Sequence, residues 1–201
     1  EVWSFLDQLV EEKTMNLMDW FQKGIPADEY IENMKENKER VKQIQSSFQI
    51  QKDEASFLTG LQTEQLKVIV LTEDWCGDAM LNVPILLEVA RHADMEVRFL
   101  YRDENLELMD QYLTNGTSRA IPIFIFINEQ GEEKAVWGPR AQELQELVNS
   151  KRSSLPPRDH EEFADRQKEM YKELQEAFLT KRELWQEVYR SIKTSLAERL
   201  F

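Results

Sequence analysis

The chain of 201 residues is 41% hydrophobic, which is enough for one large domain or two small ones with a buried core. Acidic residues outnumber basic ones by 38 to 25, and the net charge of −13 argues against binding to nucleic-acid phosphates or anionic membranes. The acidic start is unlike a secretory signal peptide, and no run reaches the roughly 20 apolar residues of a membrane span. We therefore expect a soluble cytoplasmic protein with no nucleic-acid or membrane partner.

The first 65 residues carry apolar side chains at intervals of three and four, which is the period of one helical face. Examples are Trp3, Leu6, Val10, Tyr30, Met34, Val41 and Ile44. Gly24 followed by Pro26 predicts a helix stop and a new start, and a second break is expected near residues 48–53. A short helix should then cover residues 54–65. We assign residues 1–65 to an N-terminal helical extension.

Residues 66–150 have the pattern of an α/β core. Residues 68–71 form a short apolar run that is rich in β-branched side chains. A strand over this run would be apolar on both faces, which predicts a central buried strand. The following elements are expected to be a helix over 78–91, a strand over 97–101, a helix over 104–113, strands over 122–127 and 134–137, and a helix over 140–150. The segment 128–131 between the last two strands is typical of a hairpin turn. The predicted fold is an α/β sheet of four strands flanked by helices.

The last fifty residues, 151–201, predict a pair of helices packed on this core. Pro156 and Pro157 end the preceding helix, and two apolar stripes follow at helical spacing, with a junction near Thr180. Such stripes are more often core than ligand pocket. Their extent still leaves room for a partner surface or a homodimer surface on the helical extensions.

One segment carries a chemical signal, and it contains the single cysteine. Cys76 follows the buried strand and opens a helix, where the helix dipole and free N–H groups favour a thiolate. A lone cysteine is otherwise more often a small buried apolar residue. Because the sequence has only one cysteine, it cannot form an intrachain disulfide.

The motif around Cys76 resembles the Trp-Cys-Gly-Pro-Cys site of the thioredoxin superfamily. Trp75-Cys76-Gly77 gives the first three residues at a strand-to-helix turn. Pro84 stands where thioredoxins kink the active-site helix, Pro122 stands where they have a cis-proline, and Trp137-Gly138 stands where they close the hairpin. The resemblance covers about residues 66–150, and it implies a thioredoxin-like mixed sheet with added helices at both ends.

The resemblance also implies a substrate groove beside the cysteine. Peptide bonds that precede proline are usually trans, but the resemblance implies that the bond before Pro122 is cis and that Pro122 lies against Cys76. The backbone at Ile121 would pair with an extended substrate segment. The expected site consists of Cys76 as the catalytic residue and Trp75, Gly77, Asp78, Ile121 and Pro122 as substrate-binding residues.

Three departures from the family motif change the expected chemistry. Ala79 occupies the position of the resolving cysteine, and Val70 occupies the position of the family's buried aspartate. The site is therefore at best a monothiol one, and an external thiol must resolve any mixed disulfide. Asp78 replaces the proline, and we interpret it as a helix cap in preference to an acid–base group.

Local charge predicts how reactive the thiol is. Glu73, Asp74 and Asp78 are anions close to Cys76, and they oppose the helix dipole. We expect an accessible thiol that is only modestly acidified. With two histidines, His92 and His160, and one cysteine, no recognised ligand spacing exists, so we expect neither a metal nor another cofactor.

Two functions remain open on the sequence. The first is a bacterial, cytoplasmic thioredoxin-like protein whose Cys76 forms mixed disulfides with a protein or a low-molecular-weight thiol. The alternative is a non-catalytic binding module that docks a protein partner through the cis-proline groove or the added helices.

Overall fold

A mixed five-stranded sheet forms the centre of the computed structural model, which describes residues 15–201. The strands are β1 (Ile25–Pro26), β2 (Lys67–Thr72), β3 (Glu96–Tyr101), β4 (Ile123–Ile127) and β5 (Glu133–Trp137), in the order β1-β3-β2-β4-β5. β2 and β3 are parallel, and the other neighbours are antiparallel. β4 is buried along its whole length, as expected for a strand covered on both faces. The apolar residues Trp3, Leu6 and Val10 lie outside the described residues.

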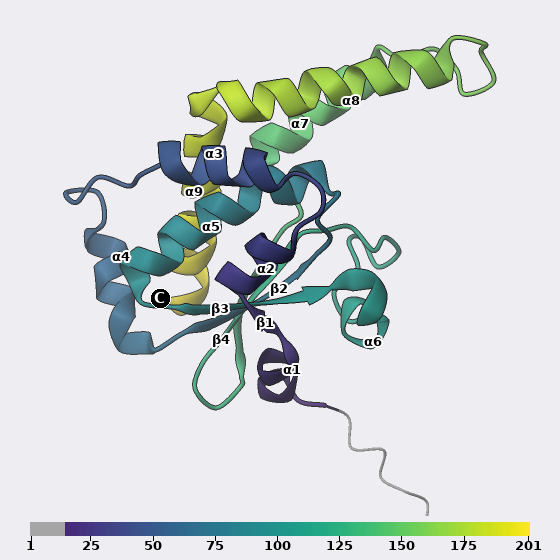
Figure 1. Ribbon diagram of the computed structural model, residues 1–201. Coiled ribbons are helices and arrows are strands. Elements are labelled where there is room, and N and C mark those ends of the chain that lie inside the picture. Colours follow the sequence, from purple (N-terminus) through teal and green to yellow (C-terminus); the bar gives the residue numbers. More distant parts are fainter. Residues whose placement is uncertain (1–14) are drawn as a thin grey trace, which may run out of the picture.

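Helices cover both faces of this sheet (Figure 1). They are α1 (Leu17–Lys23), α2 (Ala27–Asn33), α3 (Lys38–Ser47), α4 (Ser56–Gly60), α5 (Gly77–Ala93), α6 (Leu106–Met109), α7 (Gln142–Ser153), α8 (Phe163–Thr180) and α9 (Arg182–Leu200), with 3-10 turns at Leu61–Glu64 and Arg102–Glu104. α5 packs against α3, α8 and α9, and α9 also packs against β5. Figure 1 shows α3 and α8 above α5, and α1 on the other side of the sheet. The expected α/β class with helical additions is confirmed.

The sheet has one strand more than the sequence predicted. Ile25 pairs with Phe99 of β3, so the segment after Gly24 forms an edge strand before α2 begins. A Cβ on Gly24 would lie 2.9 Å from the Cβ of Arg98, so only glycine allows the chain to approach β3 this closely. The glycine therefore permits strand pairing in addition to ending a helix.

The predicted helix over residues 104–113 is much shorter in the structure. A 3-10 turn precedes α6, which ends at Met109. Between them, the buried Asn105 donates to the carbonyl of Tyr101 at 2.7 Å and accepts from Lys23 Nζ at 2.7 Å. These side-chain bonds hold Asn105 outside helical geometry, with φ −136° and ψ 47°.

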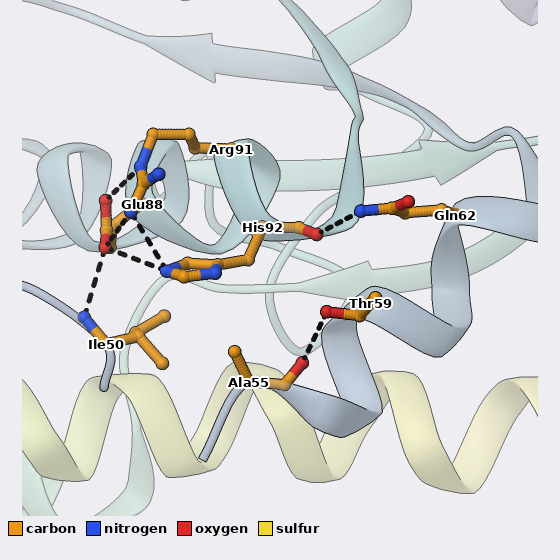
Figure 2. Close-up of polar contacts among 7 residues, drawn as sticks. All are labelled: Ile50, Ala55, Thr59, Gln62, Glu88, Arg91 and His92. Atoms are coloured by element: carbon orange, nitrogen blue, oxygen red, sulfur yellow. Dashed lines mark hydrogen bonds and ion pairs between the residues drawn. The ribbon is translucent and has the colours of Figure 1, made fainter. Parts of the chain in front are cut away.

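Glu88 fastens the segment before α4 to the last turns of α5 (Figure 2). Its carboxylate accepts from the backbone N–H of Ile50 at 3.1 Å and from the Arg91 guanidinium at 2.9 Å, and it lies 3.1 Å from Nε2 of His92. Gln62 Nε2 donates to the backbone carbonyl of His92 at 2.9 Å. The cluster thus anchors the N-terminal part of the chain at the end of α5 remote from its first turn.

Among the residues described, no helix combines the length and the apolar character that crossing a membrane would require.

Candidate functional site

Cys76 lies at the junction between the turn after β2 and the first turn of α5. Its backbone is extended, with φ −75° and ψ 120°, and its sulfur accepts from the N–H of Ala79 at 3.4 Å. The thiol donates to the backbone carbonyl of Ile121, with 3.5 Å between Sγ and O. Only 7% of Cys76 is exposed. The thiol is therefore enclosed, which contradicts the expectation of an accessible one.

The loop that enters β4 brings Ile121 against this thiol. The Ile121–Pro122 peptide bond is cis, and both residues are buried. The carbonyl that receives the Cys76 S–H belongs to the residue before this proline. The structure thus brings Cys76 close to Ile121 and Pro122, the two residues of the expected groove that are distant from it in the sequence.

Trp75 is the exposed side chain of the site, at 46%. The guanidinium of Arg102 lies over its ring at 5.2 Å from the centroid, and Arg102 Nη1 donates to the carbonyl of Arg119 at 3.1 Å. The N–H of Asp103 donates to Glu73 at 2.9 Å. Arg102 therefore links the tryptophan to the segment that leads into Pro122, and sequence reasoning missed it because no motif marks it.

The N-terminal segment holds the turn that carries Trp75. The Asp74 carboxylate accepts from the N–H groups of Lys35 at 2.8 Å and Glu36 at 3.4 Å. Asn37 Nδ2 donates to the Asp74 carbonyl at 2.9 Å. Asp74 is consequently a structural residue of the turn, and residues preceding β2 help to build the site.

Asp78 does not cap α5 as the sequence suggested, because Cys76 itself is the capping residue. The Asp78 carboxylate instead receives two hydrogen bonds from Arg140, from Nε at 2.8 Å and from Nη2 at 2.7 Å. Their side chains are 16% and 17% exposed, respectively. The aspartate that replaces the family's proline is thus one half of a shielded ion pair.

The loop between β5 and α7 presses against the Pro122 loop. Gly138 has φ +129°, and a Cβ there would lie 2.2 Å from the carbonyl oxygen of Pro122. The Gly138–Pro139 bond is cis, and the Pro139 carbonyl accepts from Asn82 Nδ2 of α5 at 3.0 Å. This loop therefore contacts both the proline loop and the active-site helix.

The C-terminal helices also reach the site. A Cβ placed on Gly77 would lie 3.8 Å from the side chain of Gln175 on α8. Glycine is thus not needed here for backbone conformation, and the first turn of α5 lies in side-chain range of α8. In Figure 1, α8 lies above α3 and α5. A helix outside the expected core therefore lies close to Gly77, the residue after the cysteine.

The thiol is poorly acidic in this environment. Burial and, to a smaller extent, the neighbouring Asp78 charge raise the pKa of Cys76 to about 11. The N–H groups of Ala79 and Asp78 and the charge of Arg140 act in the opposite direction, but they do not compensate. The modest acidification expected from the sequence is therefore wrong in sign, because burial outweighs the helix terminus.

This pKa predicts how Cys76 reacts with iodoacetamide. A thiolate is the reacting species, so the alkylation rate of the folded protein should rise about tenfold per pH unit and show no plateau up to pH ~10. The urea-unfolded chain should level off above a midpoint of about 8.5. Stopped-flow or quenched alkylation with mass detection measures both profiles. A midpoint of about 7 in the folded protein would contradict the burial argument.

The two histidines lie apart from the cysteine. His92 is bonded at the far end of α5, and His160 is exposed, with its Nδ1 accepting from the N–H of Glu162 at 3.2 Å. Within residues 15–201 no group of three histidine, cysteine, aspartate or glutamate side chains is arranged to hold a metal ion.

Comparisons with known sequences point to one family. A family model described as thioredoxin matches residues 24–153, a range that includes β1, α2 and α3. Thioredoxin H-type 1 of Nicotiana tabacum is 30% identical over 92 residues, which are 46% of this chain and 71% of the tobacco protein.

A solved structure supports the fold alone. A protein of unknown function from Pseudomonas aeruginosa superposes with a TM-score of 0.55 at 15% identity, over 83% of this chain and 96% of that one. With the match over residues 24–153, it follows that the chain belongs to the thioredoxin family.

Proposed function

We propose that this protein takes part in thiol–disulfide chemistry with Cys76 as its single nucleophile. The observation that carries the proposal is the position of the sulfur, at the N-terminus of α5 and 3.5 Å from the carbonyl of Ile121. The position of the resolving cysteine in the family motif holds Ala79, so the chemistry is of the monothiol type. We place it in a bacterial cytoplasm, where low-molecular-weight thiols are abundant and structural disulfides are rare.

The proposed reaction has two exchange steps. In the first, the Cys76 thiolate attacks one sulfur of a substrate disulfide, a new S–S bond forms to Cys76, and the other substrate sulfur leaves as a thiolate. In the second, an external thiolate attacks the substrate sulfur of the mixed disulfide, a new S–S bond forms between the substrate and the external thiol, and Cys76 leaves as a thiolate. Across the two steps the external thiol replaces one sulfur of the substrate disulfide, that sulfur is released as a thiolate, and the protein is regenerated.

The resting geometry requires the bound partner to activate the thiol. With a pKa of about 11, only about one Cys76 in ten thousand is ionised at pH 7. The S–H bond to Ile121 further favours the protonated form. A substrate segment that pairs with the Ile121 backbone would displace this bond, so substrate binding and thiol release are coupled.

Cys76→Ser tests the proposal most directly. At pH 9 the wild-type protein should form a mixed disulfide with excess oxidised glutathione, seen as one added glutathionyl group by intact-protein mass spectrometry. Dithiothreitol should reverse it. Cys76→Ser, which changes one atom of a buried side chain, should stay folded and gain no mass. A folded wild type that remains unmodified under conditions that modify the urea-unfolded chain would refute catalysis by Cys76.

The binding-module function is favoured by one specific observation, the burial of Cys76. In that case Trp75, which is 46% exposed, and the outer face of α8 around Tyr171, which is 45% exposed, would contact a protein partner or a second copy of this chain. A partner that binds Cys76→Ser as tightly as it binds the wild type would support docking without chemistry.

A further inference from the structure

The ion pair between Asp78 and Arg140 joins parts of the chain that are 62 residues apart. Both Nε and Nη2 of Arg140 donate to the Asp78 carboxylate, and Nη1 donates to Gln145 Oε1 at 2.9 Å. All three guanidinium nitrogens are therefore engaged, which fixes the orientation of the group. The low exposure of both side chains, 17% and 16%, shields the pair from solvent. The pair therefore has a fixed geometry and little contact with solvent, unlike the exposed ion pairs elsewhere on the surface.

The pair is anchored in the same first turn of α5 that carries Cys76. Asp78 lies in the first turn of α5, two residues after Cys76, and its own N–H favours the Cys76 thiolate by hydrogen bonding. Arg140 is held near by the loop from Gly138, which abuts the Pro122 carbonyl, and by the bond between Pro139 and Asn82. The loop that carries the guanidinium thus contacts both the Pro122 loop and α5.

The other ionisable groups near the thiol come from neighbouring elements. Tyr30 of α2 has a pKa raised well above its usual range by burial, so it is uncharged across the working pH range. Asp74 and Glu73 belong to the turn before Cys76 and are bonded to backbone N–H groups. Arg140, from the loop before α7, pairs with Asp78 and opposes the effect of Asp78 on Cys76, while Arg102 is the cation that acts on Glu73.

We propose that Arg140 is a positioning residue for Cys76: it partly neutralises the Asp78 carboxylate in the same helical turn and so favours the thiolate of Cys76. The inference rests on the proposed function, because the thiolate is its nucleophile. It assigns Arg140 a part of the thiolate-stabilising role that the resolving thiol has in the resembled motif, whose position here holds Ala79.

Two single substitutions with opposite expected effects test this assignment. Asp78→Asn removes the anion and leaves the cation, so the thiolate fraction of Cys76 at a fixed pH between 8 and 10 should rise about tenfold. Arg140→Gln leaves the anion uncompensated, so that fraction should fall about tenfold. Thiolate absorbance near 240 nm, referenced to Cys76→Ser, measures ionisation independently of reagent access.

Three further variants make the result interpretable. Arg140→Lys keeps the charge but not the two-pronged geometry, and it should titrate between the wild type and Arg140→Gln. It also replaces Arg140→Gln if that variant fails to fold. Glu96→Gln removes a carboxylate from an exposed pair with Arg98 at the opposite end of β3 and should leave the titration unchanged. The double variant Asp78→Asn with Arg140→Gln should titrate between the two single variants.

The outcomes separate this inference from the proposed function. Equal titrations in Asp78→Asn, Arg140→Gln and the wild type, or shifts in the same direction, would overturn the positioning role. The titrations need no substrate. If they move in opposite directions while the wild type forms no mixed disulfide, the positioning role stands and the proposed catalysis fails.

Discussion

Gly138→Ala should reduce the free energy of unfolding by about 3 kcal/mol or more, the largest stability effect that we expect from a single methyl group in this chain. The added Cβ would lie 2.2 Å from the carbonyl oxygen of Pro122 and 3.2 Å from the Cα of Ile123. Both neighbours are backbone atoms of the loop that enters β4, so no flexible side chain can move aside. The φ of +129° is also one that residues with a Cβ rarely adopt.

The effect should extend from stability to the site. Relief of the clash must move either the Gly138 loop or the Pro122 loop, and the first carries Arg140 while the second receives the Cys76 S–H through Ile121. We therefore expect faster alkylation of Cys76 together with the lower stability. Urea unfolding followed by tryptophan fluorescence gives the free energy, and iodoacetamide labelling gives the exposure.

Gly60→Ala is the matched control. Gly60 is the last residue of α4, and a Cβ there would meet nothing within 4 Å. Alanine should therefore change the free energy of unfolding by no more than about 1 kcal/mol, in the stabilising direction. If Gly138→Ala is as stable as Gly60→Ala, the close approach of the two loops is not a constraint on the fold.

The sequence could predict those parts of the fold whose signal is local. β2 and β4 have apolar residues at nearly every position because both of their faces are covered, and such runs are recognisable without tertiary information. The three- and four-residue spacing of apolar side chains in α8 and α9 likewise arises because each helix buries one face. Cys76 was found for the same reason, since the strand before it and the helix after it are both evident in the sequence.

Other features depend on contacts between distant segments, and they were not predictable. β1 is two residues long and exists only because Gly24 allows it to pair with β3. The partner of Asp78 is 62 residues away, and no motif marks Arg140. The acidity of Cys76 was misjudged because nearby charges can be read from the sequence, whereas enclosure by the Ile121 loop cannot.

Ala79→Cys should supply the missing second thiol and create an intramolecular disulfide. Ala79 is 4% exposed, and its N–H lies 3.4 Å from the Cys76 sulfur, so a sulfur on the same residue would be near the distance that an S–S bond requires. The added atom must fit in a buried position, and we expect it to cost about 1–3 kcal/mol of stability in the reduced form. In that form the second thiol can donate to the Cys76 thiolate, which lowers the pKa of Cys76.

Ala90→Cys provides the comparison for this last experiment, since Ala90 is also on α5 and also 4% exposed. Ala90 lies about 20 Å from Cys76 along the helix axis, so a cysteine there could not form a disulfide with Cys76. After mild oxidation, Ala79→Cys should titrate with no free thiols under denaturing conditions and recover two after reduction, while monomeric Ala90→Cys should keep both. A folded Ala79→Cys protein that retains two free thiols would show that the first turn of α5 lacks the geometry of a dithiol site, and the monothiol chemistry would then reflect the backbone as well as the missing cysteine.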